Sequence, residues 1–149
     1  MINICSRIVV PYDGSELSKK ALETAVTFAK QDEKIELNVI TVVDVSIARY
    51  YGANSHNIES VRKAEEAEFS AAKEALDILE ESLKSIPNKT KTFTLKGSPA
   101  ATIVNFIKEN NIDLVVMGSR GLSGLKEMFL GSVSHNVVQK SPCPVFIVK

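Results

Sequence analysis

The stretch Asp113-Leu-Val-Val-Met-Gly-Ser-Arg-Gly121 decides the fold class of this 149-residue chain. Four apolar residues in a row predict a buried strand, and the glycines that follow predict a turn. The start of the chain repeats the pattern, because Arg7-Ile-Val-Val-Pro-Tyr12 is a short apolar run closed by Asp13 and Gly14. Both runs therefore predict strands that end in turns rather than segments of helix.

Helical and strand-like segments alternate along the rest of the chain. Apolar residues at helical spacing predict amphipathic helices over 16–30, which Ser15 caps, and over 58–86. Further strands are predicted at 35–43, 90–96 and 145–148, and further helices after Ser98-Pro99 and over 132–140. This alternation predicts one α/β domain over residues 1–149, with a mostly parallel sheet and right-handed crossovers.

Two segments leave alternatives open. Residues 44–57 show no clear period and predict a long loop, which fits a functional lid and a merely variable crossover equally well. The helix over 58–86 carries a narrow apolar stripe that suits packing on a sheet or, less simply, a partner helix. The residues of this stripe are Phe69, Ala72, Leu76, Leu79, Leu83 and Ile86.

Composition excludes several classes of function. Eighteen basic residues balance eighteen acidic ones, so nothing indicates a nucleic-acid partner. No apolar run approaches the ~20 residues of a membrane span, and the N-terminus lacks the plan of a signal peptide, so we expect a cytoplasmic protein. Cys5 and Cys143 are expected to be buried or half-buried thiols, and His56 and His135 to lie on the surface without a metal.

The candidate chemistry lies in Gly118-Ser-Arg-Gly121, followed nine residues later by Gly131-Ser132. Glycine after a strand lets a ligand approach the backbone. Gly131-Ser132 opens a helix, whose first N–H groups and dipole favour an anion such as phosphate, and Ser132 and Ser134 could add hydroxyl donors. The pattern is neither a Walker A loop nor a dinucleotide fingerprint, and turns and caps alone would also explain it.

At these residues the chain resembles the ATP-binding branch of the universal stress protein family. The shared pattern is glycine, two residues, glycine, nine residues, glycine and serine, which Gly118, Gly121, Gly131 and Ser132 satisfy. The resemblance extends over nearly the whole chain, from Ile8-Val-Val-Pro-Tyr-Asp-Gly-Ser15 to Ser141-Pro-Cys-Pro-Val145. It implies an open five-stranded parallel sheet in the order 3-2-1-4-5, with helices on both faces and a ligand site at the switch point beside Asp13 and Gly118.

The resemblance also implies a role for individual residues. The end of the first strand and its aspartate approach the nucleoside, the second strand contacts adenine through its backbone, and the glycine stretch surrounds the phosphates. Arg120 could instead be a solvated loop residue, and Asp13 could cap the following turn. The cofactor-binding residues expected on this basis are Pro11, Tyr12, Asp13, Val42, Met117, Gly118, Arg120, Gly121, Gly131, Ser132, Val133 and Ser134.

The function expected from this reading is ATP-dependent regulation in a stress response, with Mg²⁺ as an optional companion of the phosphates. The alternatives are a slow ATP hydrolase and a dimeric interaction module without a nucleotide. Hydrolysis needs a group that orients water, and no residue stands out for that role, so no catalytic residue is expected. The apolar strand 145–148 predicts a homodimer, since it lies at a sheet edge in the implied order.

Overall fold

The computed structural model describes residues 5–45, 58–121 and 129–149 of the chain. The predicted loop over 44–57 and His56 therefore lie almost entirely outside the described residues. Five strands form one sheet with the order β3-β2-β1-β4-β5, and each neighbouring pair is parallel. The strands are β1 (Arg7–Pro11), β2 (Glu36–Asp44), β3 (Thr90–Gly97), β4 (Leu114–Gly118) and β5 (Val145–Val148). The sheet order expected from the sequence is confirmed.

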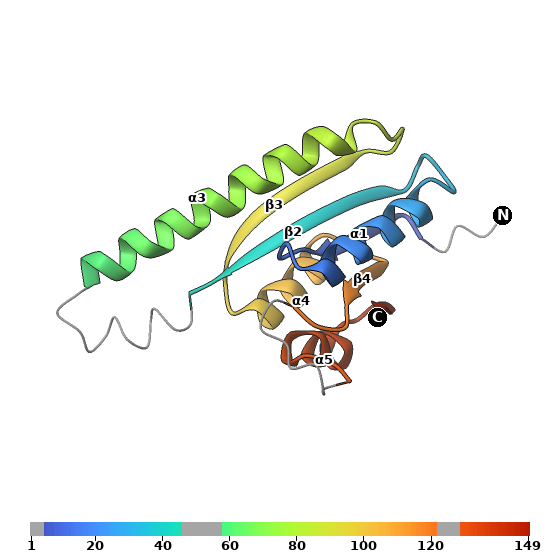
Figure 1. Cartoon of the computed structure of the whole chain (residues 1–149). Coiled ribbons are helices and arrows are strands. Elements are labelled where there is room, and N and C mark those ends of the chain that lie inside the picture. Colours follow the sequence, from blue (N-terminus) through green and yellow to red (C-terminus); the bar gives the residue numbers. More distant parts are fainter. Residues whose placement is uncertain (1–4, 46–57, 122–128) are drawn as a thin grey trace.

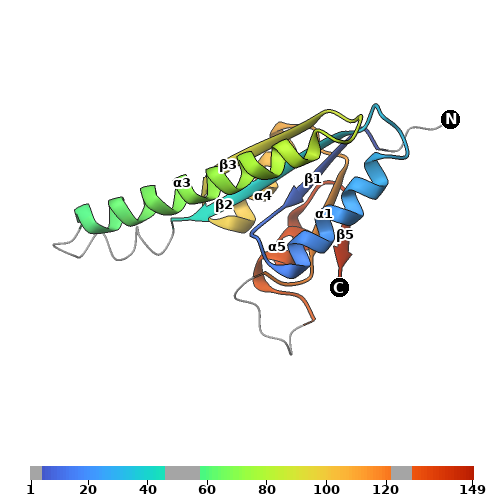
Figure 2. The same cartoon turned by 45° about the horizontal axis from the view of Figure 1, so that its top comes forward.

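Within the described ranges, four helices lie between the strands in sequence and cover both faces of the sheet (Figures 1 and 2). They are α1 (Glu16–Ala29), α3 (Ile58–Leu83), α4 (Pro99–Glu109) and α5 (Ser132–Lys140). The first face packs against α1 and α3, where Ala25 and Leu76 join strand residues such as Val39 in one core cluster. The second face packs against α4 and α5 around Ile107 and Val137.

The starts of α1 and α4 lie where the sequence signals predicted them. Ser15 caps α1, and its side chain accepts a hydrogen bond of 3.2 Å from the backbone N–H of Ser18. Pro99 occupies the first turn of α4 directly after Ser98. The stripe of α3 faces β2 and β3, with Leu76 and Leu83 buried, so packing on the sheet explains it. In Figure 1 the start of α3 reaches past the sheet beside the ends of β2 and β3.

One buried side chain joins three segments far from the candidate site. The Asn88 amide nitrogen lies 2.8–2.9 Å from the carbonyl oxygens of Ala29, Asp32 and Ile35, which share its two N–H donors. The turn before β3 is thereby fixed to the connection between α1 and β2. Both cysteines are free and half-buried, as expected. Among the described residues, no helix is both long and apolar enough to cross a membrane.

Candidate nucleotide site

The carboxyl ends of β1 and β4 lie side by side because the winding of the sheet reverses between them. In open α/β sheets, this reversal leaves a crevice where ligands bind. Asp13 follows β1, and Gly118 is the last residue of β4. A side chain on Gly121 would place its Cβ 2.5 Å from Asp13 Oδ2, so the loop after β4 passes directly over this carboxylate.

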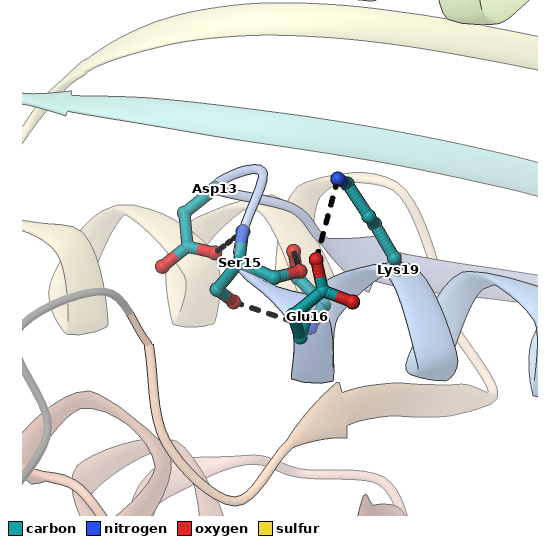
Figure 3. Close-up of polar contacts among 5 residues, drawn as sticks. Asp13, Ser15, Glu16 and Lys19 are labelled. Carbon is teal, nitrogen blue, oxygen red and sulfur yellow. Dashed lines mark hydrogen bonds and ion pairs between the residues drawn. The ribbon is translucent and has the colours of Figure 1, made fainter.

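Asp13 occupies the turn between β1 and α1 (Figure 3). Its Oδ1 accepts a hydrogen bond of 2.9 Å from the backbone N–H of Ser15. The capping role considered for Asp13 is therefore present in the structure. It does not exclude a contact with a ligand, because the carboxylate also lines the cavity described below.

The first turn of α5 faces the same crevice. The first hydrogen bond within this helix runs from His135 N to Gly131 O, at 2.9 Å. The backbone N–H groups of Ser132, Val133 and Ser134 precede that bond and have no acceptor inside the helix. Together with the positive end of the helix dipole, these groups suit an anion.

Ser134 has a different environment from the one expected. Its side chain is buried, and Oγ lies 3.1 Å from the Gly118 carbonyl oxygen and 3.0 Å from that of Ser119. A hydroxyl has one hydrogen to donate, and these carbonyl groups receive it. The expectation of a Ser134 hydroxyl donor to phosphate is therefore not supported, and this side chain instead holds α5 against the end of β4.

The glycines of the motif serve different purposes. A Cβ on Gly118 would lie 2.8 Å from Leu17 Cβ, so glycine here permits close packing of α1 on β4. A Cβ on Gly131 would meet nothing closer than 3.5 Å, and its φ of −67° suits any residue. Neither glycine has the positive φ that the sequence allowed. Of the three motif glycines, Gly131 is therefore the one at which no close protein contact and no positive φ requires glycine.

A cavity of about 780 Å³ opens at this edge of the sheet and brings the expected residues together. All of them line it: Pro11, Tyr12, Asp13, Val42, Met117, Gly118, Arg120, Gly121, Gly131, Ser132, Val133 and Ser134. The volume lies within the usual range of small-molecule sites. No expected site residue is placed elsewhere.

Sequence reasoning missed ten further lining residues. Ile40, Thr41, Val43 and Asp44 belong to β2 and could have been found from their neighbour Val42. Thr41 Oγ1 donates a hydrogen bond of 2.7 Å to the Tyr12 carbonyl oxygen and so joins the ends of two strands. The others come from three helices and have no local sequence signal: Ser18, Glu68, Ala71, Ala72, Pro99 and Ile103.

The cavity has two chemically distinct parts. Ile40, Val42, Ile103 and Met117 give one part apolar walls, which suit a flat ring. Arg120 and the start of α5 give the other part a positive character. Among residues 5–45, 58–121 and 129–149, no three His, Cys, Asp or Glu side chains gather as a metal would require.

Comparisons with known proteins match this fold and site. The family model of the universal stress protein family matches residues 5–149. Universal stress protein YxiE of Bacillus subtilis is 39% identical over 153 residues, covering 97% of this chain and 99% of the relative. The structure of universal stress protein UspA from Lactobacillus plantarum superposes with a TM-score of 0.86 at 26% identity, covering 97% of each chain.

A further solved structure contains a bound nucleotide. It is a universal stress protein in complex with cAMP, with a TM-score of 0.60 and 26% identity, covering 97% of this chain and 96% of the other. The match of the family model to almost the whole chain, and the identity to YxiE over nearly both full lengths, agree with each other. This chain belongs to the universal stress protein family.

Proposed function

We propose that this protein binds ATP in the cavity at the switch point and that nucleotide occupancy regulates its interactions with partners. One observation carries the proposal: twelve residues chosen from the sequence as a nucleotide site all line one cavity of about 780 Å³. These residues come from β1 and the turn after it, from β2, from β4 and the loop after it, and from the start of α5. Only the fold brings these segments together.

The two parts of the cavity suit the two halves of a nucleotide. The apolar side chains around β2 and α4 offer a base the dry, flat contacts that ring systems prefer. The backbone N–H groups of Ser132 to Ser134 and the guanidinium of Arg120 offer donors to the phosphates. We expect Asp13, which lines the same cavity, to contact the ribose.

The cAMP complex of a relative supports an adenine nucleotide as the ligand class. Gly131 adds support from this chain, because no neighbouring protein atom requires glycine there. An approaching phosphate would require it, since a side chain would cover the N–H groups. The proposal does not include hydrolysis. A cytoplasmic location and a role in a stress response remain predictions that accompany this function.

The proposal is tested by competition for a fluorescent adenine nucleotide. Unlabelled ATP is expected to displace the probe at a concentration at least about tenfold below that of GTP. The reason is that guanine in a site shaped for adenine would leave polar groups without hydrogen-bond partners. If ATP and GTP displaced the probe equally well, the proposed preference for adenine would be wrong. If the probe did not bind to protein that had been freed of carried-over ligand, the proposal that this cavity binds a nucleotide would be wrong.

A further inference from the structure

A second hollow lies against the start of α5 and adjoins the main cavity. It has a volume of about 480 Å³ and is lined by Phe129, Leu130, Gly131, Ser132, His135 and Asn136. Gly131 and Ser132 also line the main cavity. The two hollows are therefore separated by one short stretch of backbone, the same stretch that is proposed to bind phosphate.

The second hollow has an aromatic wall that the fold leaves exposed. Phe129 is 76% exposed, more than the exposed Phe146, which is 44% exposed. The Nζ of Lys149 lies 4.8 Å from the centroid of the Phe129 ring and holds it by a cation–π contact. His135, one turn into α5, is also exposed and lines the same hollow. An exposed phenyl face beside an imidazole suits a nucleobase, because every base can stack on an aromatic ring.

We propose that the site accepts a dinucleoside polyphosphate. One adenosine occupies the main cavity, the phosphate chain crosses the N–H groups of Ser132 and Val133, and the second nucleoside lies in the hollow against Phe129. This inference rests on the proposed function, since it uses the same phosphate position. A phosphate chain bound at Gly131 and Ser132 leads directly from the first hollow to the second, because these two residues line both.

The sizes and charges of the two hollows agree with this ligand. Volumes of about 780 and 480 Å³ both lie in the range of small-molecule sites. The larger one has room for a nucleoside with phosphates, and the smaller one for a nucleoside alone. Arg120 lines the main cavity and Lys149 contacts the Phe129 ring, so each hollow has one cation beside it.

The test compares three ligands by calorimetry with the full chain: ATP, adenosine 5′-tetraphosphate and P1,P4-di(adenosine-5′) tetraphosphate. The last two share four phosphates, and the adenosine tetraphosphate carries more negative charge, so stronger binding of the dinucleoside would not be a charge effect. We expect the dinucleoside to bind about tenfold more tightly than the adenosine tetraphosphate, the gain from one stacked base.

Variants then test whether the tighter binding of the dinucleoside depends on Phe129. Phe129→Ala should abolish the tenfold difference and leave the affinity for adenosine tetraphosphate unchanged, whereas Phe129→Trp should preserve the difference. Ile78→Ala is the control, because Ile78 is 74% exposed on the distant helix α3, and it should change nothing. Thermal unfolding without ligand establishes that each variant is folded.

Two results would overturn the inference while leaving the proposed function intact. One is equal affinity of wild-type protein for the two tetraphosphates while ATP binds. The other is a dinucleoside advantage that persists in folded Phe129→Ala. If none of the three ligands binds to wild-type protein, the proposed function falls and this inference falls with it.

Discussion

Gly118 and Gly131 belong to one sequence motif, yet the structure gives them different physical roles. A Cβ on Gly118 would lie 2.8 Å from Leu17 Cβ, 3.1 Å from the Leu17 carbonyl carbon and 3.2 Å from the Arg120 carbonyl oxygen. Two of these neighbours are backbone atoms and cannot rotate away. Gly131 has only ordinary contacts, none below 3.5 Å. The motif therefore combines a packing requirement with a proposed ligand requirement.

This difference predicts the effect of Gly118→Ala on stability. The added methyl group must displace α1 from β4, so we expect a loss of about 1–3 kcal/mol in the free energy of unfolding, the usual cost of overpacking a core. Urea denaturation of protein without nucleotide should show a lower midpoint and an unchanged slope.

Gly131→Ser is the matched control for this measurement. Gly131 caps α5, and serine is a favourable residue at such a position, so its stability should stay within about 0.5 kcal/mol of wild type. If Gly118→Ala were as stable as this control, the close packing of α1 on β4 would not be the reason for glycine at position 118.

Ser134 shows the limit of reading single residues from sequence. A serine hydroxyl in the first turn of a helix could donate a hydrogen bond to a phosphate or to a protein carbonyl group. The sequence pattern is the same in both cases. The structure places its hydroxyl 3.1 Å from the Gly118 carbonyl oxygen. Only the fold, which brings the end of β4 beside α5, decides between these uses.

At the scale of elements, local signals were sufficient to predict helices and strands. The helix expected over 16–30 is observed as Glu16–Ala29, because Ser15 and the apolar spacing mark its start and its buried face. The helix expected to end at residue 86 ends at Leu83 and is followed by turns before Pro87. The strand expected over 35–43 is shifted by one residue, to Glu36–Asp44.

One part of the site that the sequence did not predict belongs to α3. Glu68, Ala71 and Ala72 line the cavity, although their spacing is that of any amphipathic helix. They reach the site because α3 packs along β2 and β3, and the start of this helix extends past the ends of those strands (Figure 1). That placement depends on the relative lengths of two elements far apart in the sequence, which no local pattern records.

The edge strand β5 supports a prediction about assembly. It pairs with β4 on one side, and Phe146 remains 44% exposed while its ring contacts Phe28 edge to face, with centroids 5.2 Å apart. An apolar edge strand favours pairing with a second copy around a two-fold axis. We expect wild-type protein at micromolar concentration to sediment at twice the 16.3 kDa of one chain.

Phe146→Lys should shift this assembly to the monomer, because it places like charges close to the axis and removes apolar contact area. Ile78→Lys introduces the same charge at a more exposed position on α3 and should leave the dimer intact. A wild-type monomer, or a Phe146→Lys protein that remains fully dimeric, would exclude β5 as the dimer edge.

At the scale of the whole molecule, the sheet order makes the site possible. The order β3-β2-β1-β4-β5 places the ends of β1 and β4 together, although Pro11 and Gly118 are 107 positions apart in the sequence. The glycine motif predicted a phosphate site after β4, and the family resemblance predicted the neighbouring strand. The cavity lies where the end of β1 and the loop after β4 meet. Its shape and the contribution of α3 could therefore be seen only in the folded molecule.

The most direct test of the central claim is calorimetric titration of ATP into wild-type protein and Gly131→Val. The φ of −67° at Gly131 suits valine, and the poorer helix cap costs about 1 kcal/mol, so the variant should fold. Its branched side chain would cover the N–H groups at the start of α5. We predict saturable ATP binding to wild type and none to the variant, with thermal unfolding showing both folded. A folded Gly131→Val protein that binds ATP with wild-type affinity would contradict the account.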